Sequence, residues 1–173
     1  MAQSSPTISP PSTAAFEALS ENASPEERLA ALGIELPPVP GAVGDYAPWV
    51  ITGHLLMTSG QLPWIDGDLK FVGKVGSDLT VEQGYQSFRL SAINVVAQLK
   101  SAVGDLSKIK RIVRLEGSVN CAPGFTDQAT ALNGASQLIN QVFGAKGLHT
   151  RMINSDPDMV MNCATLVCVT AEV

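Results

Sequence analysis

The polar residues that could carry chemistry are few, and one arginine stands out among them. Arg151 follows His149 by two residues and directly precedes the apolar pair Met152-Ile153. An arginine beside backbone donors can bind a carboxylate through two parallel hydrogen bonds. A lone histidine or arginine before a strand can equally be an ordinary surface residue, so the pattern alone leaves both interpretations open.

The three cysteines, Cys121, Cys163 and Cys168, indicate free thiols in a reducing compartment. Their odd number and the lack of a CxxC pair disfavour a disulfide framework, and with only two histidines in the chain a zinc site is disfavoured as well. Cys168 shares a predicted strand face with Leu166 and Thr170, where packing is the expected role. Cys121 precedes a Pro-Gly turn and is expected to be more exposed, but no neighbouring base would activate it.

Charge disfavours a nucleic-acid partner. The 173 residues hold 11 Lys and Arg against 16 Asp and Glu, a net charge of −5. The one basic run comprises Lys108, Lys110, Arg111 and Arg114. It could contact phosphate or RNA, but we favour the solvated rim of a strand, because no aromatic residues interleave with it.

The low charged fraction predicts that part of the surface is covered. Charged residues make up 16% of the chain, against roughly 25% in an average domain. Burial of one face against further copies of the chain would explain this. No apolar run approaches the roughly 18 residues of a membrane span, and the N-terminal residues lack a basic signal region. We therefore expect a cytoplasmic protein with no membrane contact.

We expect a flexible tail over residues 1–23. The helices and strands that must position the candidate residues follow it. Ser24, Pro25 and Glu27 form the capping pattern of a short helix. That helix and a proline-rich linker are assigned to residues 24–40, and a single domain to residues 41–173. Most of the excess acid lies in the first 40 residues, which hold five acidic residues and one basic residue.

Within the domain, the pattern predicts an α+β fold with two helices packed on one face of a sheet. A Gly53-His54 turn joins two strands, and a further strand is expected after Asp66-Gly67. The remaining expected elements are a helix from Thr80 to about Val103, a strand with Ile109, Val113, Leu115 and Val119 on one face, a helix over 126–143, and closing strands at 151–153 and 163–173. No helix remains for the other face of the sheet, which again indicates self-association.

Several short strings together carry a family resemblance over about residues 26–173. They are Leu32-Gly33-Ile34-Glu35-Leu36-Pro37-Pro38, Thr58-Ser59-Gly60-Gln61-Leu62-Pro63, Gly73-Lys74-Val75-Gly76, Val119-Asn120-Cys121-Ala122-Pro123-Gly124-Phe125, Asn133-Gly134-Ala135-Ser136 and His149-Thr150-Arg151. The sequence resembles the RidA/YjgF family, also called L-PSP endoribonuclease-like, and in particular its longer branch with an N-terminal helix.

The resemblance implies a chorismate-mutase-like fold with a mixed sheet, assembled as a homotrimer with clefts between subunits. It further implies hydrolysis of reactive enamines and imines, such as 2-aminoacrylate, to a 2-keto acid and ammonia. No metal or organic cofactor is implied, and the expected partner is a small molecule with a carboxylate.

The resemblance also implies roles for individual positions. Arg151 matches the arginine that pairs with the substrate carboxylate, and backbone groups near Ile153 would help to hold the substrate nitrogen and water. The remaining matched positions, which would line the cleft, are Tyr46, Ser59, Gly60 and Asn133.

One position departs from the family pattern. The glutamate that orients water is expected 17 residues after the arginine, where this chain has Cys168, and its companion acid is replaced by Leu166. A thiol with a pKa near 8.5 is a poor general base at neutral pH. Deaminase activity of a weak or substrate-shifted kind therefore competes with a second hypothesis, a non-catalytic or pathway-specific trimer that binds a small carboxylate or a partner protein. A third hypothesis, the ribonuclease activity that the family's other name suggests, is disfavoured by the net charge of −5 and the few basic residues.

Overall fold

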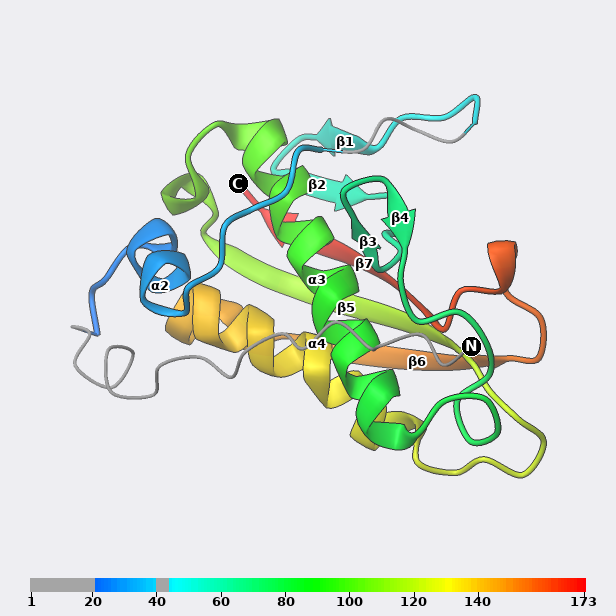
Figure 1. Cartoon of the computed structure of the whole chain (residues 1–173). Helices are drawn as coiled ribbons and strands as arrows, with labels where there is room; N and C mark the ends of the chain where they lie inside the picture. The colour runs from blue at the N-terminus through cyan, green and yellow to red at the C-terminus, as the bar shows by residue number, and fades with distance from the viewer. Residues whose placement is uncertain (1–20, 40–43) are drawn as a thin grey trace.

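The computed structural model describes residues 21–39 and 44–173. Its central element is a five-stranded mixed sheet (Figure 1). The strand order is β1-β2-β7-β5-β6, and all neighbours are antiparallel except the parallel pair β5 and β6. Their bounds are β1 Trp49–Thr52, β2 Leu55–Thr58, β5 Arg111–Asn120, β6 Thr150–Asp156 and β7 Thr165–Glu172. A separate small hairpin is formed by β3 Trp64–Ile65 and β4 Asp68–Leu69.

Two helices cover one face of this sheet, as the sequence predicts (Figure 1). α3 (Val81–Val103) begins with a capping box between Thr80 and Gln83 and ends at Gly104, which has a positive φ. α4 (Gln128–Phe143) packs against α3, and both place their apolar side chains over the sheet. Every residue of α3 from Ser87 to Leu99 is buried, because the sheet, α4 and the N-terminal segment surround this helix.

The N-terminal helix is part of the same hydrophobic core. α2 (Pro25–Ala31) has the expected capping box between Ser24 and Glu27. Leu29 and Leu32 are buried in the main core. Glu26 accepts hydrogen bonds from the Lys100 ammonium at 2.5 Å and from the Leu106 N–H at 2.9 Å. Burial alone would raise the pKa of Glu26, but these hydrogen bonds outweigh it and hold the pKa below its usual value.

No helix of the described residues covers the opposite face of the sheet, which presents exposed apolar side chains. Val50 and Leu55 on the hairpin, Met57 beside β7 and Met152 on β6 are all exposed, although each lies within a strand. The uncovered face is thus the one that the sequence predicts.

Two of the sequence expectations are wrong in detail. The strand predicted after Asp66-Gly67 is the two-residue β4, and the chain then bends away at Phe71, whose φ is positive. The sequence predicts that Val113 is on the buried face of its strand, but β5 has a bulge between Ile112 and Arg114. The bulge turns Val113 outward, and Ile112 is buried instead. An extra residue in a strand reverses the alternation on one side of the bulge, and the apolar pattern does not show where it occurs.

The close contact between α3 and α4 gives a stability prediction. A Cβ at Gly134 would lie 2.0 Å from the Tyr85 carbonyl oxygen, so the two helices must move apart in Gly134→Ala. In a helix, alanine is more favourable than glycine by about 1 kcal/mol. The cost of overpacking is larger, so we expect the unfolding free energy of this variant to fall by about 1–3 kcal/mol. Urea unfolding at fixed protein concentration measures this. The exposed α4 substitution Thr130→Ala is the control, expected within about 0.5 kcal/mol of the parent; equal stability of both variants would contradict the prediction.

Candidate functional site

Arg151 is held against helix α4 by two hydrogen bonds. Its Nη1 donates to the Asn133 Oδ1 at 2.8 Å and to the Ser136 hydroxyl at 3.2 Å. Asn133 and Ser136 are three residues apart and therefore lie on the same face of the helix. Two positions that the sequence singles out, Arg151 and Asn133, are thus in direct contact. Ser136 belongs to the same short string as Asn133, but its role was missed.

His149 completes this cluster from the other side of Ser136. Its Nδ1 lies 2.6 Å from the Gly147 carbonyl oxygen and its Nε2 lies 3.2 Å from the Ser136 hydroxyl. Since a carbonyl can only accept, Nδ1 carries a proton; in the neutral ring Nε2 would accept from the hydroxyl of Ser136. The Ser136 oxygen also accepts the hydrogen bond of Arg151. His149 and Arg151 thus share Ser136 as a hydrogen-bond partner.

The rest of the Arg151 guanidinium has no partner among the described residues. Its Nε and Nη2 make no hydrogen bond there, and the side chain is exposed. These two nitrogens form the edge that binds a carboxylate in a bidentate way. Ile153 lies two residues further along β6 on the same face and is half-buried. Because β6 is an edge strand of the sheet, its backbone beside Ile153 has one side without a neighbouring strand in the described chain.

Ser59 and Gly60 lie in a second place, where the chain leaves β2 and runs beside β7. The Ser59 hydroxyl donates to the Ala47 carbonyl at 2.7 Å. Gln61 exchanges two backbone hydrogen bonds with Val167, and its side-chain amide donates to the Ser59 carbonyl at 3.2 Å. A Cβ at Gly60 would approach the Leu166 side chain to 2.5 Å, so glycine permits the close contact with β7.

Tyr46 lies next to this second group in the chain, directly before Ala47, and its side chain is 52% exposed. An aromatic ring this exposed is available for contact with a ligand or with another protein chain. Because Ser59 is hydrogen-bonded to Ala47, the residue after Tyr46, all three positions Tyr46, Ser59 and Gly60 lie near β2 and β7.

Cys168 lies on the uncovered face of the sheet, opposite Glu116 of β5. Burial raises the pKa of the Cys168 thiol and the negative charge of Glu116 raises it further, while Arg114 opposes them. Glu116 also forms an ion pair with Arg114. A carboxylate therefore does lie beside the position where the family glutamate is missing, but it comes from the neighbouring strand. The sequence placed Glu116 on the outer face of its strand and not beside Cys168, because strand register is absent from the local pattern.

Arg151 and Cys168, two of the predicted site residues, lie on opposite faces of the sheet. In the parallel pair, Arg151 lies opposite Leu115, whose side chain is fully buried under the helices. Cys168 lies opposite Glu116, the next residue of β5. Successive side chains of a strand point to opposite faces, so the Arg151 and Cys168 side chains leave the sheet in opposite directions. A single chain does not bring them together.

The other two cysteines are buried among apolar residues. Cys163 is fully buried, and this burial raises the pKa of its thiol to about 11. Cys121 is only 9% exposed, so the expectation that it is the more accessible thiol is wrong. It lies in a bridge to Val75 rather than in an open turn. All three thiols are free, as the sequence predicts. The described residues also contain no group of three or more His, Cys, Asp or Glu that could hold a metal ion.

The thiols give a prediction for alkylation. At pH 8 a pKa of about 11 leaves roughly one Cys163 in a thousand as the reactive thiolate. We expect iodoacetamide to modify Cys163 at least about 100-fold more slowly in the native protein than in guanidinium-denatured protein. Mass spectrometry of peptides from timed samples measures both rates. Equal rates in the two states would contradict the burial of this residue.

Comparison with known proteins identifies the family. The sequence model described as "YjgF/chorismate_mutase-like, putative endoribonuclease" matches residues 26–173. The chain is 43% identical over 124 residues to Protein TCP17 of Trypanosoma cruzi, covering 71% of this chain and 78% of that protein. It is 47% identical to a "putative endoribonuclease" from Shewanella oneidensis, whose crystal structure superposes with a TM-score of 0.86 over 87% of this chain and 100% of that one.

A more distant relative shares the fold. TdcF of Escherichia coli, crystallised with bound serine, is 22% identical and superposes with a TM-score of 0.58, covering 78% of this chain and 93% of that one. Within the described part of the chain, none of the helices is long and apolar enough to cross a membrane. The motifs, the helix-covered mixed sheet and the match over residues 26–173 agree, and the chain belongs to the YjgF/RidA family, with its chorismate-mutase-like fold.

Proposed function

We propose that this protein hydrolyses small reactive enamines and imines, of the 2-aminoacrylate and 2-iminopropanoate type, to a 2-keto acid and ammonia. One observation carries the proposal: Asn133 and Ser136 fix the Arg151 guanidinium, while its Nε and Nη2 have no partner in the described part of the chain. A carboxylate bound on that edge would have a defined orientation, because two parallel hydrogen bonds fix a planar group. The serine bound to TdcF is a small amino acid with such a carboxylate.

The chemistry needs little more than orientation. The enamine isomerises to the imine, water adds to the C=N carbon, and the resulting carbinolamine releases ammonia to leave the 2-keto acid. A C–O bond forms, the C–N bond breaks, and the oxygen's protons pass to the departing nitrogen. Because imine hydrolysis is intrinsically easy, holding the substrate beside backbone groups and a water molecule gives useful acceleration. Ile153 follows Arg151 by two residues on the edge strand β6, so its backbone is a candidate for holding the water.

The complete cleft, on this proposal, lies between copies of the chain in a homotrimer. Arg151, Asn133 and Ile153 would come from one copy, and Tyr46, Ser59, Gly60 and Cys168 from its neighbour. Two features support this assignment. The Arg151 and Cys168 side chains leave opposite faces of one chain's sheet, and the uncovered face exposes Val50, Leu55, Met57 and Met152. Exposed apolar side chains on one face of a sheet are typical of a surface that another copy covers. The three free thiols fit a reducing cytoplasm.

A second candidate function is binding without turnover. Cys168 and Leu166 stand where the family pattern has acids, and the pKa of the Cys168 thiol is raised, so this thiol is a still weaker base than a free one. The nearby carboxylate of Glu116 is engaged by Arg114. A trimer with the arginine clamp but without a group to activate water would bind a small carboxylate, or a partner protein, without hydrolysing an imine.

Loss of the clamp distinguishes a specific site from background hydrolysis. With 2-iminopropanoate generated by an amino-acid oxidase, we expect Arg151→Ala to lower the rate constant of imine loss by about 10- to 100-fold, because a charge-assisted bidentate contact is removed. Asn133→Ala is expected to cost less, since the arginine keeps its bond to Ser136. Arg111→Ala, which removes an exposed arginine at the start of β5, is the control and should match the parent.

The outcome that would contradict catalysis is a parent rate equal to that of buffer. Calorimetry with 2-keto acids then tests the second candidate: binding that is lost in Arg151→Ala supports a binding role. Cys168→Glu would separate the two further. A rate that rises only in this variant means that the scaffold is competent but lacks the group that activates water. Sedimentation analysis of the parent tests the trimer, and a monomer would contradict a cleft between copies.

A further inference from the structure

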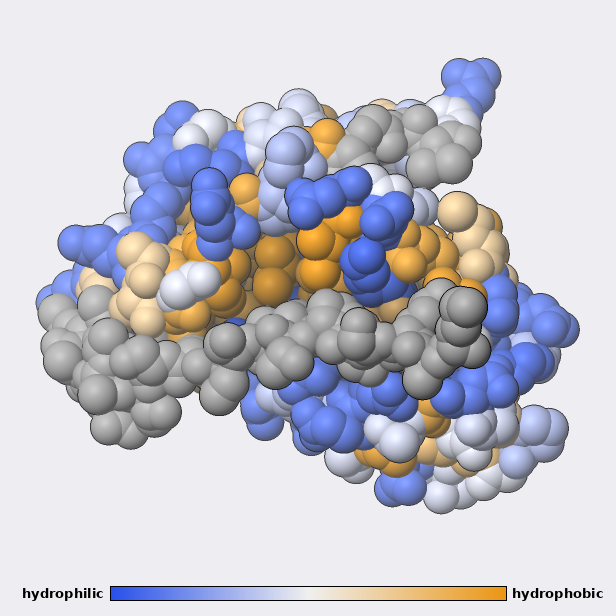
Figure 2. All heavy atoms as spheres, in the orientation of Figure 1, coloured by the Kyte–Doolittle hydropathy of each residue, from blue (hydrophilic) through white to orange (hydrophobic). Residues whose placement is uncertain are grey.

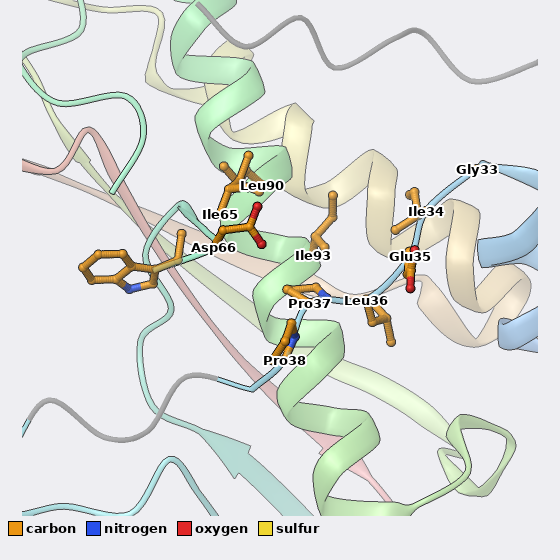
Figure 3. A pocket seen from close by; sticks show the side chains of 11 residues that line it. Gly33, Ile34, Glu35, Leu36, Pro37, Pro38, Ile65, Asp66, Leu90 and Ile93 are labelled. Carbon is orange, nitrogen blue, oxygen red and sulfur yellow. The ribbon is translucent and has the colours of Figure 1, made fainter. Parts of the chain in front are cut away.

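A second concave region lies on the helix-bearing face, apart from the arginine cluster. It is a groove of about 450 Å³ between the segment of residues 33–38, the β3–β4 hairpin and helix α3 (Figure 3). A second hollow, with Pro37, Pro38, Trp64 and Asp66 in common with the first, continues it toward Asn94. Figure 2 shows apolar side chains gathered in a hollow in the middle of this face. Neither the imine chemistry nor the proposed subunit cleft uses this groove.

The floor and walls of the groove are apolar. Leu90 and Ile93 of α3 lie at its base, and Ile34 and Leu36 enter from the N-terminal segment (Figure 3). Trp64 lines both hollows. An aromatic ring in such a wall offers a flat apolar surface and a negative face that attracts cations.

The charged side chains that line the groove are both acidic. Glu35 lies on the N-terminal segment and Asp66 at the hairpin turn, and both are exposed (Figure 3). Neither forms an ion pair with a described residue. No lysine, arginine or histidine lines either hollow in the described part of the chain. The negative charge at the groove is therefore not neutralised by its own walls.

A buried hydrogen-bond acceptor lies at the far end of the groove. Asn94 has no exposed surface, and its amide nitrogen donates to the carbonyls of Leu62, Trp64 and Leu90. Its Oδ1 has no donor among the described residues, although Asn94 lines the second hollow. A buried acceptor without a donor is uncommon and is often satisfied by a water or a ligand. Like the two carboxylates, this oxygen can only accept hydrogen bonds.

We propose that this groove binds an organic ammonium ion with an apolar body, such as an arylalkylamine. The body would lie on Leu90 and Ile93 beside Trp64, and the ammonium would lie at the rim of the groove, against the carboxylate of Glu35 or of Asp66. A carboxylate or phosphate ligand is disfavoured there by both acidic side chains. The arginine cluster on α4 and β6 has the opposite preference, so the groove and that cluster select different ligands.

Binding can be followed through one tryptophan. Trp49 and Trp64 are the two tryptophans of the chain, and Trp49→Phe leaves Trp64 as the reporter. The probe is 2-phenylethylammonium, compared with neutral 2-phenylethanol and anionic 3-phenylpropionate. We expect saturable changes in Trp64 emission with the cation, binding at least about fivefold weaker for the alcohol, and none for the acid. Raising the salt concentration is expected to weaken the binding of the cation and to leave the binding of the alcohol unchanged.

Charge removal tests the site directly. Glu35→Gln with Asp66→Asn keeps the shapes of both side chains, and asparagine tolerates the positive φ of residue 66 as aspartate does. We expect the affinity for the cation to fall about tenfold. The control pair is Glu82→Gln with Asp127→Asn, which changes the net charge by the same amount. Both residues are exposed, at the N-terminal ends of α3 and α4, and this variant should retain the parent affinity.

Three results would overturn the proposal: no cation binding at millimolar concentration, equal binding of the alcohol, or equal loss in the control pair. Each is independent of the imine assay, because Arg151→Ala should leave the Trp64 signal unchanged. Thermal unfolding of every variant confirms that the fold is retained before binding is compared.

Discussion

The alternation of side chains across one five-stranded sheet governs where this protein can do chemistry. Each strand sends every second side chain under the helices and the others to the bare face. Arg151 goes with the first set, where Asn133 and Ser136 of α4 hold it. Cys168 and Glu116 go with the second set. Arg151 and Cys168, which the family resemblance groups into one site, are therefore separated by the thickness of the sheet, and a cleft that includes both has to take them from two chains.

The sequence predicts those parts of the fold that local chemistry determines. The capping boxes at Ser24 and Thr80 and the helix end at Gly104 are confirmed because each depends on a few adjacent residues. The apolar spacing of α4 likewise placed Leu132, Ala135, Ile139 and Val142 in the core. The exchange of Ile112 and Val113 was missed because a bulge is fixed by pairing with β7 and not by the residues of β5 alone.

The candidate site shows the same division between local and distant information. The resemblance supplied Arg151 and Asn133, and the structure joins them by a hydrogen bond. Ser136 could have been found from its spacing to Asn133 on one helix face. The position of Glu116 beside Cys168 could not be found, because strand register depends on which strands pair. The groove beside Glu35 and Asp66 was also missed, since it is formed where three distant segments meet.

The order of the strands has a consequence for how the molecule forms. β7 lies in the middle of the sheet, bonded to β2 on one side and to β5 on the other, yet it follows every other strand in the sequence. Until β7 is inserted, β1 and β2 have no sheet to join, and β5 has an open edge. During synthesis on the ribosome, the helices and the first hairpin emerge well before their common support. Pairings between distant segments form slowly and expose apolar strands in the meantime. The sheet of this protein therefore closes late, after the last of its strands has left the ribosome.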